Sequence, residues 1–271
     1  HVSVLLQECI DGLNIKPDGI YVDGTLGGAG HSSQIAKRLT TGRLIGIDRD
    51  PVALAAAGKR LEPYKDRVTL VHSNFCEIAS VLRDLQIEGV DGILLDLGVS
   101  SPQLDDGARG FSYMADAPLD MRMNNEDPLT AAEVVNTWPY EELKRILYDY
   151  GEERYAPKIA AAICARREQQ TIRTTLELVD IIRSAMPASA LREKQHPAKR
   201  SFQAIRIAVN DELGSVEKVM RDAIPCLNPG GRLAIITFHS LEDRIVKNGM
   251  AEAAKGCTCP PKLPVCVCGK K

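Results

Sequence analysis

The sequence predicts an α/β fold, a doubly wound, Rossmann-like parallel sheet with an inserted all-helical domain. Over the first hundred residues, short apolar runs alternate with helical patterns, which is typical of βαβ units. From Asp105 to about Phe202 the strand signal disappears while helical patterns continue. Strand-like sequence resumes at Leu233–Phe238, after the turn Asn228-Pro-Gly-Gly, so the helical stretch interrupts one sheet domain.

Hydrophobic runs and the residues that flank them predict the strands and helices of the sheet domain. Buried parallel strands are continuous apolar runs, and helices between them carry apolar residues at helical spacing. Asp50 is a natural N-cap, with Pro51 at the first helical position. The strands are expected at Ile20–Val22, Leu44–Ile47, Val68–Val71 and Ile93–Leu97, and the helices between them at Ser32–Leu39, Pro51–Leu61 and Glu77–Leu85.

The insert is expected to consist of helices joined by loops rich in Pro, Asp and Asn. Its clearest helical patterns lie at Tyr140–Tyr150, Pro157–Gln169 and Leu176–Met186. We therefore divide the chain into a sheet domain formed by residues 1–104 and 203–248, a helical insert formed by residues 105–202, and a cysteine-rich tail formed by residues 249–271.

Composition excludes several classes of protein. With 271 residues, 44% hydrophobic and 26% charged, the chain is neither disordered nor a coiled coil. No apolar run of about 20 residues and no signal peptide is found, so we expect a cytoplasmic protein without a membrane partner. The net charge of −2 excludes a globally basic nucleic-acid binder. Nevertheless, bases outnumber acids nine to four between Arg166 and Arg206, which indicates a solvated helical face or a site for a polyanion.

The eight cysteines fall into two groups. Isolated residues in apolar or helical surroundings are expected to be buried free thiols in a reducing compartment. Paired C-x-C knuckles in the tail are able to hold Zn²⁺, but standard knuckles use C-x₂₋₄-C, so we favour free thiols and predict no metal. The isolated cysteines are Cys9, Cys76, Cys164 and Cys226, and those of the tail are Cys257, Cys259, Cys266 and Cys268.

A glycine-rich loop follows the first strand and opens a helix, in the run from Asp23 to Ser32. Neither the dinucleotide fingerprint nor the P-loop fits, because Ser33 replaces the third glycine and no Lys-Ser/Thr pair closes the loop. An acid at the strand end followed by glycines is the pattern of S-adenosylmethionine (SAM) sites, where Asp23 lies near a cationic ligand. Asp48 ends the second strand and is the candidate for the ribose diol. Phe75 is expected either against the adenine or in the core.

The fourth strand leads into Asp96-Leu-Gly-Val-Ser-Ser-Pro-Gln, where Ser101-Pro102-Gln103 is related to the Asp/Asn/Ser-Pro-Pro-aromatic loop of many amine methyltransferases. A conjugated exocyclic amine is a poor nucleophile, so acceptors that hold its protons favour attack on a methyl group. Backbone carbonyls around Ser100–Pro102 and the carboxylates of Asp96 or Asp105 are the candidates. Pro225-Cys226 resembles the nucleophile of cytosine-C5 enzymes, but its helical setting favours a buried thiol.

Taken together, these residues resemble the bacterial MraW (RsmH) family, which methylates N4 of a cytidine in 16S ribosomal RNA. The resemblance covers residues 1 to about 247 and includes Pro118-Leu-Asp-Met-Arg-Met, Tyr150-Gly-Glu-Glu-Arg, Phe202-Gln-Ala-Ile-Arg-Ile-Ala-Val-Asn-Asp-Glu and Thr237-Phe-His-Ser-Leu-Glu-Asp. It implies that the insert helps to bind 16S rRNA within the small ribosomal subunit or its precursor. It also implies SAM contacts at Ala29, Gly30, His31, Asp48, Phe75, Asp96 and Gln103.

Several alternatives stay open. The run that contains His239 is expected to line the cytosine pocket, with structural hydrogen bonding as the competing role. Phe111, Tyr113 and Phe202 are candidates for base stacking or for core packing. A nicotinamide oxidoreductase is disfavoured by the broken fingerprint, and the non-enzymatic alternative is an RNA-binding ribosome assembly module with a vestigial SAM site. Both a monomer and a homodimer are compatible with the sequence.

Overall fold

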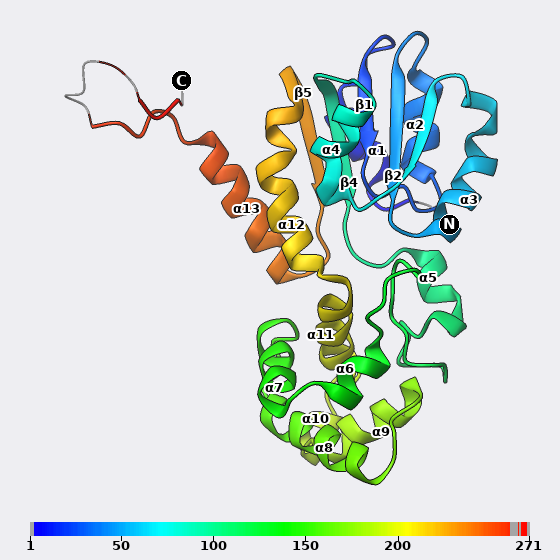
Figure 1. Cartoon of the computed structure of the whole chain (residues 1–271), viewed down its shortest axis with the longest axis vertical. Helices are drawn as coiled ribbons and strands as arrows, with labels where there is room; N and C mark the ends of the chain where they lie inside the picture. The colour runs from blue at the N-terminus through cyan, green and yellow to red at the C-terminus, as the bar shows by residue number, and fades with distance from the viewer. Residues whose placement is uncertain (1–2, 261–264, 266, 270–271) are drawn as a thin grey trace.

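The computed structural model describes residues 3–260, 265 and 267–269, and it has an α/β lobe joined to a helical lobe (Figure 1). The α/β lobe contains a five-stranded sheet in the order β3-β2-β1-β4-β5, and every neighbouring pair is parallel. The predicted fold class is confirmed. The strands are β1 (Ile20–Asp23), β2 (Arg43–Asp48), β3 (Val68–His72), β4 (Val90–Asp96) and β5 (Leu227–Ile236).

Successive apolar residues of each strand face opposite sides of the sheet, because the side-chain period of a strand is two. On β1, Tyr21 belongs to the cluster beneath α1, α2 and α3, whereas Val22 belongs to the cluster beneath α4 and α12. The same division separates Leu94 from Leu95 on β4. Both faces are thus covered, as a parallel sheet requires. The helices of this lobe are α1 (Leu6–Leu13), α2 (Gly30–Arg38), α3 (Pro51–Leu61), α4 (Ile78–Asp84), α12 (Glu212–Asp222) and α13 (Ser240–Ala254).

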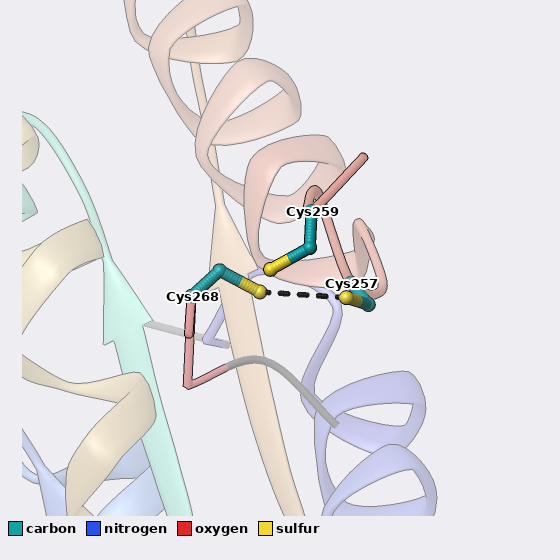
Figure 2. A group of neighbouring side chains, drawn as sticks. All are labelled: Cys257, Cys259 and Cys268. Carbon is teal, nitrogen blue, oxygen red and sulfur yellow. Dashed lines mark hydrogen bonds between the residues drawn. The ribbon is translucent and has the colours of Figure 1, made fainter. Parts of the chain in front are cut away.

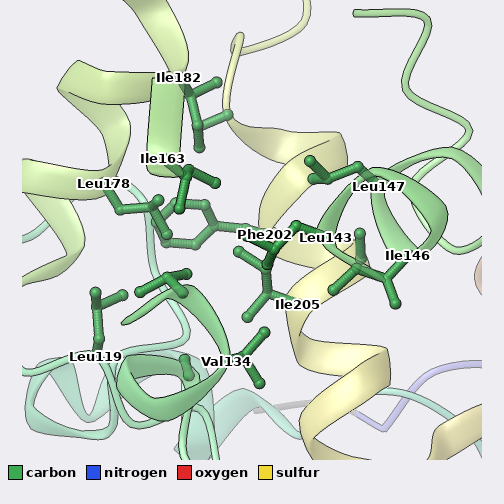
Figure 3. Close-up of a cluster of buried hydrophobic side chains, with 14 of the residues drawn as sticks. Leu119, Val134, Leu143, Ile146, Leu147, Ile163, Leu178, Ile182, Phe202 and Ile205 are labelled. Atoms are coloured by element: carbon green, nitrogen blue, oxygen red, sulfur yellow. The ribbon is translucent and has the colours of Figure 1, made fainter. Parts of the chain in front are cut away.

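The helical lobe has a hydrophobic core of its own (Figure 3). Phe202, which is only 3% exposed, lies among Ile163, Leu178 and Ile182 from other helices of the lobe. Val209 also belongs to this core, so α11 contributes to the helical lobe beyond residue 202. The segments of the lobe are α5 (Ser101–Asp105), α6 (Ala131–Thr137), α7 (Tyr140–Asp149), α8 (Ala156–Gln169), α9 (Thr175–Ser184), α10 (Ala188–Leu191) and α11 (Lys199–Asn210).

The last strand differs from its prediction. The turn expected at residues 228–231 is part of β5, which ends at Ile236 and not at Phe238. The strand absorbs the extra residues as an irregularity, because its register steps from Val90↔Leu227 to Gly92↔Arg232 and Gly230 has φ +80°. The strand therefore ends two residues early, and Phe238 enters the following loop with 56% exposure.

Among the described residues, no helix is both long and apolar enough to cross a membrane.

Candidate active site at the carboxyl edge of the sheet

The strand order changes direction between β1 and β4, which makes the carboxyl ends of these strands the expected ligand crevice. Asp23 ends β1, Asp96 ends β4, and Asp48 ends the adjacent strand β2. The parallel register brings these three carboxylates to one edge of the sheet. The acids predicted from sequence to form one site are therefore brought together by the fold.

The glycine loop is shaped by two left-handed residues, Gly27 at φ +48° and Ala29 at φ +58°. Its backbone binds the neighbouring strands: the Gly27 N–H donates to Asp48 Oδ2 at 2.7 Å, and Thr25 Oγ1 accepts from the Asp96 N–H at 2.6 Å. Gly24 lies so close to β4 that a Cβ there would be 2.5 Å from Leu95 Cδ2. The loop is thus held against the strand ends, and Thr25 is a positioning residue that the sequence analysis did not single out.

Asp23 is the most enclosed of the three acids, with 1% exposure. Its Oδ2 accepts from the Ser32 hydroxyl at 2.7 Å, and its Oδ1 accepts from the Thr25 N–H at 3.2 Å. Burial raises the pKa of Asp23, although these hydrogen bonds and His31 act in the opposite direction. Both of its oxygens contact the protein, so Asp23 supports the start of α2 and contributes charge from beneath the crevice.

Asp96 has a different environment. Its Oδ2 lies 4.0 Å from His31 Nδ1, and its Oδ1 is buried without a hydrogen-bond partner among the described residues. The pKa of Asp96 is raised to about 6, chiefly by burial; the charge of His31 acts against this rise, and the charges of Asp23 and Glu242 add to it. A buried oxygen without a partner is costly, and a donor from a bound ligand would remove that cost.

His31 opens α2 and is oriented by the N-terminal segment, because its Nε2 lies 3.0 Å from the Val4 carbonyl oxygen. Its side chain is 7% exposed and directs Nδ1 towards Asp96. Asp48 has both carboxylate oxygens bound by backbone N–H groups, those of Gly27 and, at 2.8 Å, Asp50. Burial raises its pKa to about 6. Asp48 thus keeps lone pairs at the strand end for a further donor.

Gln103 is buried, but its amide is bound within the protein. Its Oε1 accepts from the Ser100 N–H at 3.1 Å, and its Nε2 donates to Asp50 Oδ2 at 3.0 Å. Arg109 Nη1 donates to the same Asp50 oxygen at 2.9 Å. The Asp50 side chain also accepts from the Val52 N–H, which confirms its predicted cap of α3. Asp50 therefore joins the sheet to the first turn of the insert, a role that sequence did not reveal.

The segment expected to be a loop after β4 is the short helix α5, with Ser100 and Gln103 forming a capping box. Of the backbone acceptors predicted there, the Ser100 carbonyl accepts from the Leu104 N–H and the Pro102 carbonyl accepts from the Asp106 N–H, so each keeps only its second lone pair for a substrate. Ser101, Pro102 and Asp105 are exposed on this helix. Of the acceptors named from sequence, Asp96 is the buried one whose Oδ1 has no partner among the described residues.

His239 follows β5 and caps α13, which supports the structural role considered for it. Its Nε2 lies 3.2 Å from Glu242 Oε1, and Glu242 Oε2 accepts from the Phe238 N–H at 2.9 Å. Burial raises the pKa of Glu242, but the hydrogen bonds from His239 and Phe238 outweigh it and the pKa is lowered. The pair thus fixes the loop that exposes Phe238.

The aromatic side chains considered for base stacking differ in their burial. Phe111 and Phe202 are buried in the helical core, and Tyr113 packs against it with its ring stacked on His196 at 4.5 Å. These rings therefore have core roles. Phe75 is partly buried beside the glycine loop and packs against the sheet. The exposed ring in this region is that of Phe238, named at first only as part of the run that contains His239.

The cysteine predictions are partly confirmed. Cys9 and Cys76 are buried, whereas Cys164 and Cys226 are only partly buried. Burial raises the pKa of Cys226, and Asp222 raises it further. A thiol with a raised pKa is a poor nucleophile, which agrees with the structural role predicted for Cys226.

Comparison with known proteins decides the family. A family model described as the MraW methylase family matches residues 1–271. The chain belongs to the MraW methylase family. The match includes the tail, which the resemblance seen in the sequence did not cover.

Relatives of this member of the MraW methylase family are close over its whole length. A protein of Brevibacillus brevis named ribosomal RNA small subunit methyltransferase H is 58% identical, covering 100% of this chain and 87% of the relative. A Clostridium botulinum protein of the same name is 59% identical, again covering 100% and 87%. A solved rRNA methylase from Streptococcus thermophilus matches with a TM-score of 0.31 and 16% identity, covering 44% of this chain and 71% of that one.

Proposed function

We propose that this chain is a SAM-dependent methyltransferase that methylates the exocyclic N4 of a cytidine in 16S rRNA of the small ribosomal subunit or its precursor. Membership of the MraW methylase family and the names of the relatives support this assignment. The observation that carries it is the carboxyl edge of the sheet at the ends of β1, β2 and β4, where a glycine loop lies beside three carboxylates.

The residues present fit SAM. The ligand carries a sulfonium and an ammonium. The charge of the buried Asp23 raises the pKa of both Asp48 and Asp96, so a cationic ligand would stabilise the ionised carboxylates. Asp48 lies at the second strand end, where a ribose diol is commonly bound. Ala29, Gly30, His31, Phe75 and Gln103 would complete the site.

The bound cofactor supplies an electrophilic methyl group, and the protein's part is positioning and electrostatics. The residues at the strand ends would hold the target nitrogen close to the cofactor. An acidic acceptor at the mouth holds the N–H protons of the amine, which favours a pyramidal nitrogen with an available lone pair. We assign this role to Asp96. Among the acceptors considered, it alone has a buried oxygen without a partner in the described part of the chain.

The helical insert, which we keep as residues 105–202 with a cysteine-rich tail after 248, is proposed to bind the rRNA backbone. Most bases of the run from Arg166 to Arg206 are exposed, whereas Arg206 binds Glu212 at 2.8 Å and Arg167 donates to backbone carbonyls. Phosphate contacts by exposed bases would make binding weaken with salt. The exposed bases of the run are Arg166, Arg173, Arg183, Arg192, Lys194 and Lys199.

The target base has to leave its stack to reach the crevice. The exposed Phe238 ring, held in place by the His239–Glu242 pair, is our candidate for stacking on it.

Transfer of labelled methyl groups from SAM to small ribosomal subunits tests the proposal. We expect N4-methylcytidine in the nucleosides after digestion, and a loss of at least 100-fold in rate for Asp96→Ala, because one preorganised acceptor contributes on this scale. Label at cytosine carbon 5, or none at all, would contradict the proposal. Binding of rRNA without transfer would favour the assembly module with a vestigial SAM site. Light scattering of the purified protein separates the homodimer from the monomer.

A further inference from the structure

The tail beyond α13 brings three cysteines together outside the catalytic crevice. The side chains of Cys257, Cys259 and Cys268 point towards one another (Figure 2). Their sulfur atoms all lie within 4.8 Å of one another, and the Cys257 and Cys268 sulfurs are 3.6 Å apart. Cys266, the fourth cysteine of the predicted group, lies outside the described residues.

These distances fit a bound ion better than a covalent bridge. A disulfide requires sulfurs about 2.05 Å apart. Tetrahedral Zn²⁺ with Zn–S bonds of about 2.3 Å has ligand atoms about 3.8 Å from each other. The Cys257–Cys268 separation is close to the second value, and three sulfurs meet at one point where a disulfide joins only two.

The backbone around the sulfurs also fits a metal knuckle. The Val267 N–H donates to Cys259 Sγ at 3.3 Å, and Gly269, directly after Cys268, has φ +69°. N–H donors to sulfur stabilise the thiolate that a metal needs. After Glu252 the sequence has four lysines and no acid, so the local charge favours gathered thiolates.

The described valines of the tail do not pack in a core that would bring the cysteines together. The tail extends away from both lobes (Figure 1), and its Val265 and Val267 side chains are 70% and 79% exposed. Cys257 and Cys268 are nevertheless neighbours although they are 11 residues apart in sequence. Segments too short to bury a core are commonly held by a disulfide or a metal.

We infer that Cys257, Cys259 and Cys268 form a structural Zn²⁺ site in the tail. Thiolates select soft ions, and Zn²⁺ is the usual one in structural sites. This differs from the sequence-based preference for free thiols without a metal, which was drawn from the C-x-C spacing. The inference does not depend on the proposed methyl transfer.

A second group with metal-ligating atoms serves as the competing location. Glu212, His239 and Glu242 also have ligand atoms within 4.8 Å of one another. Their oxygens are already bound, since Arg206 donates to both Glu212 oxygens at 2.8 and 3.0 Å, and Phe238 N–H and His239 contact Glu242. An ion there would have to displace the Arg206 guanidinium, and the carboxylates of this group are hard ligands, whereas Zn²⁺ in structural sites is commonly bound by thiolates.

The test measures metal in the purified, reduced protein after addition of Zn²⁺ and removal of the excess. We expect about one zinc per chain by mass spectrometry, as for a closed structural site, and intense near-ultraviolet thiolate-to-metal absorption when Co²⁺ replaces it. Cys257→Ser combined with Cys268→Ser should abolish both signals. The matched control, Cys164→Ser with Cys226→Ser, should retain them.

Limited proteolysis supplies a readout independent of stoichiometry. With zinc bound, cleavage after Lys255 should slow at least 10-fold relative to chelator-treated protein, and the cysteine double variant should lose this protection. Circular dichroism that matches the wild type shows that the variant is folded, as expected for an exposed tail. Zinc retained by the double variant, absence of bound zinc in the reduced wild type, or a Cys257–Cys268 disulfide in protein purified without reductant would overturn the assignment.

Discussion

Replacement of Asp50 by alanine should destabilise the whole molecule, because this side chain joins the two lobes. Its carboxylate is 3% exposed, caps α3 through the Val52 N–H, and accepts from Gln103 and from Arg109 at 2.9 Å. Loss of an N-cap costs about 1 kcal/mol. Removal of one partner of a buried ion pair costs about 3–5 kcal/mol, because it leaves the other charge unpaired.

These contributions overlap, so we expect a free-energy loss of about 4 kcal/mol for Asp50→Ala. For a chain of this size each kcal/mol lowers Tm by about 2–4 °C, which gives a decrease of about 8–16 °C. Differential scanning calorimetry measures it. Asp66→Ala is the matched control, since Asp66 is 68% exposed and pairs with Arg67 only at 3.5 Å, so its Tm should change little.

A double-mutant cycle with Arg109→Met isolates the ion pair. Because Met removes the buried guanidinium, Asp50→Ala should cost much less in the Arg109→Met background than in the wild type. A decrease in Tm below about 3 °C for Asp50→Ala, or additive effects in the cycle, would refute the role assigned to Asp50.

Four further outcomes are expected. Burial raises the pKa values of Asp48 and Asp96 to about 6, so calorimetric SAM affinity should rise with pH through about 6, by up to about tenfold per pH unit for each carboxylate that must ionise, and a flat profile would contradict this role. The same pKa shifts lower the free energy of unfolding as the pH rises from about 4 to about 6. In this range both carboxyl groups still hold protons in the folded state that they have already lost in the unfolded chain. Phe202→Ala should cost about 3–5 kcal/mol and speed hydrogen exchange throughout the helical lobe, whereas the 64% exposed Tyr148→Ala should stay near wild type; equal effects would argue against the core role. Cys226→Ser should keep methyl transfer within about twofold, because burial raises the pKa of this thiol; a loss above about tenfold would restore the nucleophile hypothesis.

The sequence predicted those residues of the candidate site that lie directly at the ends of strands. Asp23, Asp48 and Asp96 each terminate an apolar run, and parallel strands place their carboxyl ends together. The acceptors near Ser101 and Pro102 stay a prediction, but the Ser100–Gln103 capping box turns this segment from the expected loop into a helix, whose Ser100 and Pro102 carbonyls already accept one hydrogen bond each.

Sequence alone determined the sheet, the insert and the acids at the strand ends, because hydrophobic period and capping residues act over a few neighbours. Only the tertiary structure showed which acid has an oxygen without a hydrogen-bond partner among the described residues. It also showed that Asp50 binds Arg109, 59 positions away in the sequence, and that three sulfur atoms of the tail converge. Such pairings depend on how distant segments meet in space, and no local pattern along the chain records that meeting.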